Sequence, residues 1–129
     1  MSSLSSPESD FEALGGAEGV QRLITLFVDR VASDFIIGFF FERVDLNRVK
    51  KMEANLACIH LGGPGEYVGR PVGKAHSPYP INAGHFRRRL AILRTVLTEQ
   101  GVDPEIIARW LAHDQTLQGQ VTNGQECAP

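Results

Sequence analysis

The side chains able to bind a metal ion or attack a substrate are few in this sequence. Two cysteines, Cys58 and Cys127, lie 69 residues apart, so they form neither a CxxC redox pair nor the closely spaced ligand pairs of a zinc site. The other candidate ligands include four histidines, which are His60, His76, His85 and His113. A neutral imidazole is a common metal ligand, but a single histidine is more often an ordinary polar residue. Spacing alone therefore selects none of the four.

The size and charge of the chain limit the class of protein. A chain of 129 residues with 43% hydrophobic and 22% charged side chains corresponds to one folded domain. The formal net charge of −2 argues against nucleic acid as a partner. The longest apolar run, residues 35–41, is too short to cross a membrane, and the first residues do not resemble a signal peptide. We expect a cytoplasmic domain with neither a nucleic-acid nor a membrane partner.

The spacing of apolar residues predicts an all-α domain. Such residues recur every three or four positions along 20–31, 46–59, 83–97 and 106–111, as in amphipathic helices. A short helix is expected at 10–14, and Asp45 and Asp103 fit helix N-caps. The expected inner face of the helix at 46–59 consists of Leu46, Val49, Met52, Leu56 and Ile59. We expect a flexible tail over 1–9, the helical domain over 10–121 and a second tail over 122–129.

Two segments depart from this helical pattern. Residues 35–41 are apolar on all sides and predict either a buried strand or a short buried helix. Residues 62–82 contain nine glycines and prolines among 21 positions, and an irregular loop of that length is usually functional or disordered. In a small all-helical domain, a large prosthetic group would supply the packing partner that such a loop lacks.

Several short motifs, in order, resemble those of the truncated haemoglobins, the class of short globins. Leu14-Gly15-Gly16 resembles the glycine stop after the shortened first helix, and Phe40-Phe41 the phenylalanine pair at the family's corner. Leu61-Gly62-Gly63-Pro64 followed by Tyr67-Val68-Gly69 resembles the second glycine motif with its Tyr-x-Gly. Ala75-His76 and His85-Phe86 resemble the proximal-histidine segment and the start of the next helix. The resemblance covers about residues 11–118, fits the first subgroup best and implies a two-on-two helical sandwich around haem.

The resemblance implies that haem b is the cofactor and that His76 is the proximal ligand of its iron. A neutral imidazole is the ligand of globin haem, and no CxxCH motif is present for a thioether attachment, so we expect non-covalent binding. By the same resemblance, Phe41 packs against the haem face, and Phe86 and Leu56 line the pocket. Tyr67 is a candidate contact of a haem propionate, together with basic side chains such as Lys50.

The distal side differs from the pattern of the family. Val28 stands where the first subgroup often has a tyrosine, and Glu53 stands where a glutamine is common. One turn before Glu53 is Val49, which is not polar. Bound dioxygen carries partial negative charge and is stabilised by hydrogen-bond donors. Valine donates nothing and an ionised glutamate only accepts, so tight retention of oxygen is not expected.

Met52 stands where some relatives place a second ligand of the iron. A thioether is a competent axial ligand, and a His/Met pair raises the reduction potential of haem. Met52 therefore either completes a six-coordinate haem with His76 or fills space inside the helical domain, as methionine often does. In the second case the sixth position holds water, hydroxide or nothing.

Arg89 is a candidate partner of Glu53. An ion pair between them would allow both charges to be buried and would place a guanidinium donor near a bound ligand. Alternatively, both side chains point into solvent, because Arg87-Arg88-Arg89 is a basic run and such runs usually form a solvated face. We favour the solvent interpretation.

Three functions follow from these features. The first is a truncated haemoglobin that binds a diatomic gas (O2, NO or CO), for which the resemblance implies a reductase partner and nitric oxide dioxygenase or peroxidase-like activity. The second is a six-coordinate His/Met haem protein in electron transfer or in redox or gas sensing, where a displaceable Met52 provides a switch. The third is a haem-free helical interaction module that uses Arg87-Arg88-Arg89 as a binding patch. We favour the first, and a Soret band in the purified protein separates the third from the others.

Overall fold

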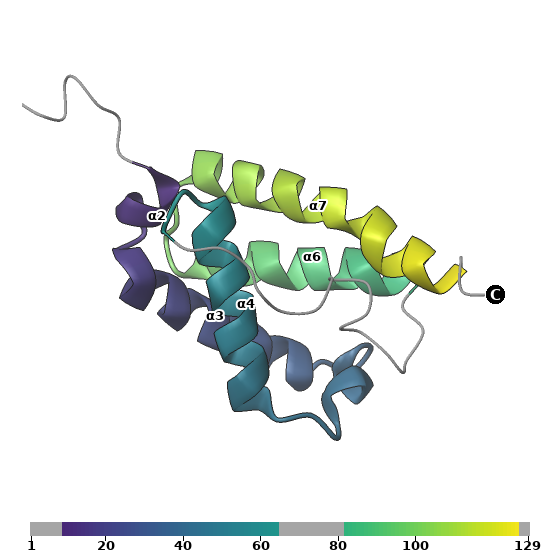
Figure 1. Cartoon of the computed structure of the whole chain (residues 1–129). Coiled ribbons are helices and arrows are strands. Elements are labelled where there is room, and N and C mark those ends of the chain that lie inside the picture. The colour runs from purple at the N-terminus through teal and green to yellow at the C-terminus, as the bar shows by residue number, and fades with distance from the viewer. Residues whose placement is uncertain (1–8, 65–81, 127–129) are drawn as a thin grey trace, which may run out of the picture.

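Helices make up every regular element in the parts of the chain that the computed structural model describes, residues 9–64 and 82–126. They are α2 (Asp10–Ala13), α3 (Gly16–Ala32), the 3-10 helix η1 (Gly38–Phe41), α4 (Leu46–His60), α6 (Ala83–Glu99) and α7 (Pro104–Glu126). Helix α4 crosses α3, and α6 and α7 run antiparallel beside each other (Figure 1). The predicted all-α, two-on-two fold is confirmed. Helix α7 continues to Glu126, into the segment expected to be a tail.

Local sequence signals set the helix starts. Ser9 forms a capping box with Glu12 at the start of α2, and Asn82 forms the equivalent pair with His85 at the start of α6. The predicted N-cap Asp45 accepts hydrogen bonds from the first backbone N–H groups of α4. These contacts satisfy donors that would otherwise lack partners in the first turn. Within the described ranges, no helix is both long and apolar enough to cross a lipid bilayer.

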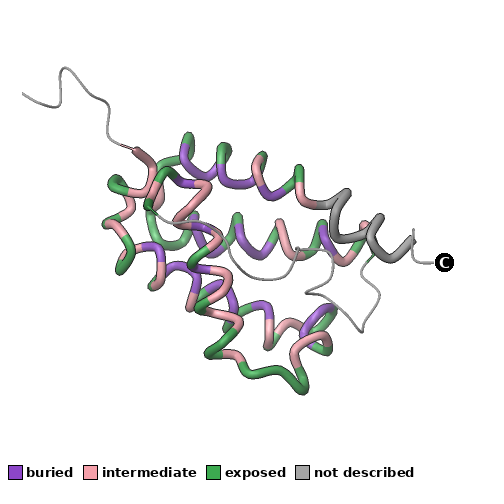
Figure 2. The backbone as a smooth tube through the Cα atoms, viewed as in Figure 1, coloured by how far each residue is buried: buried purple, intermediate pink, exposed green. Residues whose placement is uncertain are grey.

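Helix α3 lies at the centre of the hydrophobic core (Figure 2). All of its predicted apolar positions are buried, namely Val20, Leu23, Ile24, Phe27, Val28 and Val31. They form one cluster with buried side chains of α6 and α7, including Leu97 and Trp110. At the rim, Arg109 of α7 donates two hydrogen bonds to the Asp10 carboxylate of α2, at 2.8 and 2.9 Å. The first and last helices are thereby joined.

The apolar segment at residues 35–41 contains a short helix, as one of the two alternatives predicted, but it is only partly buried, so the prediction was wrong in part. The segment turns and then forms η1, and the Phe35 side chain is 99% exposed. Asp34 is the reason, because its carboxylate accepts the backbone N–H groups of Ile36 and Ile37 and fixes a tight turn. Ile37 is therefore buried, whereas Phe35 is left in solvent.

Candidate functional site

Helix α4 has two apolar faces on nearly opposite sides. Its buried residues are Ala54 and Ala57, which belong to the core that α4 shares with α3. Met52 lies two positions before Ala54, or about 200° around the helix at 100° per residue. Met52, Leu56 and Ile59 are half-buried and are not among the residues of the described core. We call these three residues the outer strip of α4.

The prediction for the inner face of this helix was therefore wrong in part. Of the five residues expected to face inward, only Leu46 and Val49 pack against the core, and even these are half-buried. The small side chains of Ala54 and Ala57 allow α4 to approach α3 closely, so the core contact forms on their side. The larger apolar side chains of the outer strip lie half-buried outside that core.

Of the other predicted site residues, the structure describes some and leaves others outside its described ranges. Phe86 is buried on α6, and Phe41 is half-buried in η1 and packs against the core. His76 and Tyr67 lie outside the described residues, so their predicted roles stay predictions. The Nζ atom of Lys50, a candidate propionate partner, lies 2.8 Å from the carboxylate of Asp29.

Arg89 connects three helices through its guanidinium group. Its Nη2 atom donates to Oε1 of Glu53 on α4 at 3.0 Å and lies 3.8 Å from Oδ2 of Asp114 on α7. The guanidinium carbon also lies 4.9 Å from the centroid of the Phe27 ring and 6.0 Å from that of Phe86. These distances correspond to cation–π contacts.

The interpretation that Glu53 and Arg89 both point into solvent was wrong. Their side chains are only 22% and 21% exposed, because they lie between helices and neutralise each other. The other two arginines of the basic run behave differently. Arg87 and Arg88 are exposed, and Arg88 also pairs with Asp34, whereas Arg89 forms an ion pair between helices.

The guanidinium group of Arg89 therefore lies near two carboxylates, those of Glu53 and Asp114. Burial lowers the pKa of Arg89, but the charges of Glu53 and Asp114 outweigh this effect, so its pKa is raised and it stays cationic. Burial raises the pKa of the Asp114 carboxyl group, Arg89 lowers it, and the neighbouring charge of Glu53 raises it again. The sum of these effects is a raised pKa, because the charge of Asp114 is only partly compensated.

Asp114 also faces a pair of histidines that sequence reasoning did not bring together. The Nε2 atom of His60 lies 3.9 Å from Oδ1 of Asp114, and the rings of His60 and His113 stack with their centroids 3.9 Å apart. Burial and then the charge of His113 lower the pKa of His60 to about 4, so its ring is neutral at pH 7. A signal for Asp114 was present, because it follows Ile107 by seven positions and Trp110 by four, on the buried side of α7.

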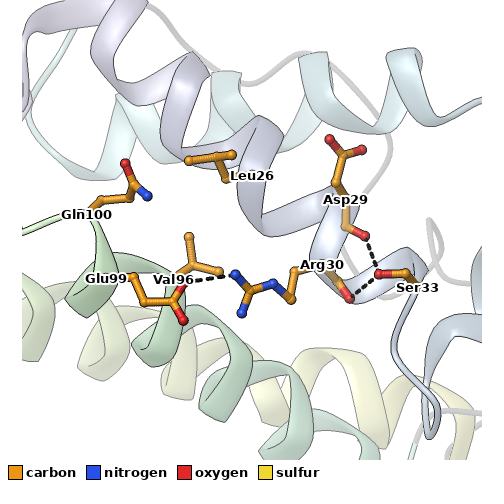
Figure 3. Close-up of a pocket in the computed structure, with 7 residues that line it drawn as sticks. All are labelled: Leu26, Asp29, Arg30, Ser33, Val96, Glu99 and Gln100. Carbon is orange, nitrogen blue, oxygen red and sulfur yellow. Dashed lines mark hydrogen bonds and ion pairs between the residues drawn. The ribbon is translucent and has the colours of Figure 1, made fainter.

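A pocket of about 220 Å³ lies elsewhere, between α3 and α6 (Figure 3). It is lined by Leu26, Asp29, Arg30, Ser33, Val96, Glu99 and Gln100, none of which is a predicted site residue. Arg30 and Glu99 form an ion pair of 2.8 Å at its edge, with both side chains about half exposed. Such exposed pairs contribute little free energy, and the pocket brings together no chemistry beyond this pair.

Comparisons with known proteins agree on one family. The model of the bacterial-like globins matches residues 9–123. The group 1 truncated haemoglobin GlbN of Mycolicibacterium paratuberculosis is 29% identical over 119 residues, which cover 92% of this chain and 88% of that protein. GlbN of Synechocystis sp. is 30% identical over 102 residues, covering 76% and 82%. The crystal structure of the 2/2 haemoglobin from Synechococcus sp., in the cyanomet state with covalently attached haem, has a TM-score of 0.84 at 24% identity, covering 90% of this chain and 99% of that chain. At that identity the likeness concerns the fold.

Proposed function

Because this chain belongs to the truncated haemoglobins of the bacterial-like globin family, we propose that it binds haem b without a covalent link and takes a diatomic gas at the haem iron. We propose His76 as the proximal ligand, since it matches the proximal-histidine segment of the family. The observation that supports this function best is the outer strip of α4, which presents large apolar side chains away from the core.

The apolar side chains of the outer strip suit the binding of haem. The haem macrocycle is flat and mostly apolar, and the outer strip offers a half-buried apolar face of matching character. Glu53 lies next to this strip, because it is about 60° around the helix from Leu56, and it is paired with Arg89. When bound, haem supplies an iron centre that accepts O2, NO or CO as a ligand.

Arg89 is the donor that we propose for a gas bound on this side. Val28 is buried in the core and offers no donor, and Val49 is also apolar. A guanidinium group has five N–H donors, and the 3.0 Å contact with Glu53 uses only the terminal Nη2 atom. Glu53 fixes the position of the guanidinium group, which lies over the ring of Phe27. Hydrogen bonding to a bound gas would then come from α6 rather than from the tyrosine and glutamine that are common in the family.

The ultraviolet–visible spectrum of the purified protein tests the role of His76. We expect a Soret band in the wild-type protein and its loss, or greatly weakened haem affinity, in His76→Ala, because the iron loses its protein ligand. His85→Ala is the matched control, since the described role of His85 is to cap α6. An unchanged spectrum and haem affinity in His76→Ala would contradict the assignment. No Soret band even after haem addition would support the haem-free interaction module.

A six-coordinate His/Met haem protein in electron transfer or sensing is the second candidate, and the position of Met52 on the outer strip favours it. It predicts a low-spin spectrum in both the ferric and the ferrous states that is lost in Met52→Leu. Leucine keeps the apolar volume and removes only the thioether, so a packing role would survive this change. A five-coordinate, high-spin ferrous spectrum in the wild-type protein would instead leave the distal position open for gas.

A further inference from the structure

Three metal-ligating side chains meet where the last residue of α4 lies against α7. Ring nitrogens of His60 and His113 and a carboxylate oxygen of Asp114 all lie within 4.8 Å of one another. We propose that these three residues bind a divalent transition-metal ion, of which Zn2+ is the representative. This site goes beyond the proposed haem function and shares no residue with the proposed iron ligands.

The three side chains form a donor set that suits zinc. Two imidazoles and one carboxylate bind Zn2+ in proteins, with the fourth tetrahedral position left to water. A metal needs the neutral imidazole, and binding releases a proton wherever the ring is protonated. His60 is already neutral at pH 7, because burial and His113 lower its pKa to about 4. Its lone pair is therefore available at no cost in protonation.

The surroundings of Asp114 favour a cation on one side of its carboxylate. Oδ2 lies 3.8 Å from Arg89, whereas Oδ1 faces His60 at 3.9 Å. Both distances are too long for a direct hydrogen bond, and the side chain is only 7% exposed. Arg89 is itself held by Glu53, so it can orient the carboxylate as an outer partner of the ligand.

The charge of the neighbourhood is also suitable for a cation. One positive charge on Arg89 stands against the two negative charges of Glu53 and Asp114 when both acids are ionised. Bringing a divalent ion to Oδ1 would relieve the burial cost that raises the pKa of Asp114. The net charge of the cluster therefore attracts the ion, although an arginine is present.

Metal binding requires a movement of one imidazole ring. The rings of His60 and His113 are nearly parallel, with 16° between their planes, and imidazole binds a metal in the plane of its ring. Bonds of about 2.0 Å place tetrahedral ligand atoms roughly 3.3 Å apart, so the donor atoms must also move closer together. Rotation of one side chain achieves both and breaks the stacking of the two rings.

Calorimetric titration of the full chain with Zn2+ tests the site. We expect one ion per chain and at least a hundredfold weaker affinity in His60→Gln, His113→Gln and Asp114→Asn. Glutamine and asparagine keep polar side chains, and circular dichroism will show that each variant is folded. His85→Gln is the control, because His85 caps α6 and belongs to neither proposed site. It should bind Zn2+ like the wild-type protein.

Trp110 provides a second readout close to the site. It is the single tryptophan of the sequence, and the His60 ring lies edge-on to it at 5.6 Å. Its fluorescence should change on addition of Zn2+ in the wild-type protein and in His85→Gln, but not in His60→Gln. Absence of binding in the wild-type protein, or equal loss in His85→Gln, would overturn the proposal. The haem assignment depends on the spectrum of His76→Ala, so the two proposals can fail separately.

Discussion

Arg89 illustrates how strongly one residue can depend on its neighbours. The same side chain would be an exposed arginine two positions earlier, where Arg87 lies. At position 89 it lies between Glu53 and Asp114 and over the ring of Phe27. Removing one partner of such a pair costs more than the pair contributes, because the remaining charges lose their compensation. Removing Arg89 should therefore lower the free energy of unfolding more than removing the charge of Glu53.

Arg89→Met tests this inequality, since methionine keeps an unbranched apolar chain without the charge. We expect a loss of about 3 kcal/mol in the free energy of unfolding, because Glu53 and Asp114 then face each other without a cation. Glu53→Gln should cost about 1 kcal/mol, since the amide oxygen still accepts a hydrogen bond and Asp114 remains. Urea unfolding measures both values. Arg87→Met is the exposed control, and equal losses in Arg87→Met and Arg89→Met would refute the argument.

At the scale of helices and turns, the Asp34 carboxylate connects the turn after α3 to helix α6. Its carboxylate accepts three hydrogen bonds from Arg88, two from Nε at 3.2 Å and one from Nη2 at 2.6 Å, in addition to those from the N–H groups of the turn. The hydrogen bond with Arg88 is the main reason that the pKa of Asp34 is lowered from 3.8 to about 2. The position of η1, and with it Phe41, depends on this connection.

The stability that Asp34 provides should be lost in acid. Above pH 5 the carboxylate is ionised in both the folded and the unfolded chain. As the pH falls from about 4 to about 2, the unfolded chain takes up a proton first, so unfolding becomes easier. The difference in free energy of unfolding between wild-type protein and Asp34→Asn should therefore be largest near neutral pH and shrink through this window. Urea unfolding at pH 7, 4 and 3 measures it, and a difference that stays constant would show that the pairing has no such effect.

At the scale of the whole molecule, the sequence predicted the features that depend on residues close together along the chain. Periodicity and caps such as Asp45 and Asp103 placed the helices, because these signals act within one or two turns. The sequence did not show which side of α4 packs against the core. Alanines and larger apolar residues alternate along this helix, and contact with α3 determines which side is buried. The Glu53–Arg89 pair was considered but not favoured, because its partners are 36 residues apart and local charge patterns do not report such contacts.

The hydrogen-bonded ion pair between Asp10 and Arg109 should affect the rate at which the protein unfolds. It joins positions 99 residues apart, so it closes almost the longest loop available and should form late in folding. Interactions absent from the transition state act on the unfolding rate and leave the folding rate nearly unchanged. Because the pair is exposed, its effect is small, and Asp10→Asn should speed unfolding modestly in stopped-flow kinetics, whereas an equal change in the folding rate would place the contact earlier. The two ends of the helical domain thus govern the lifetime of the folded molecule more than the speed at which it forms.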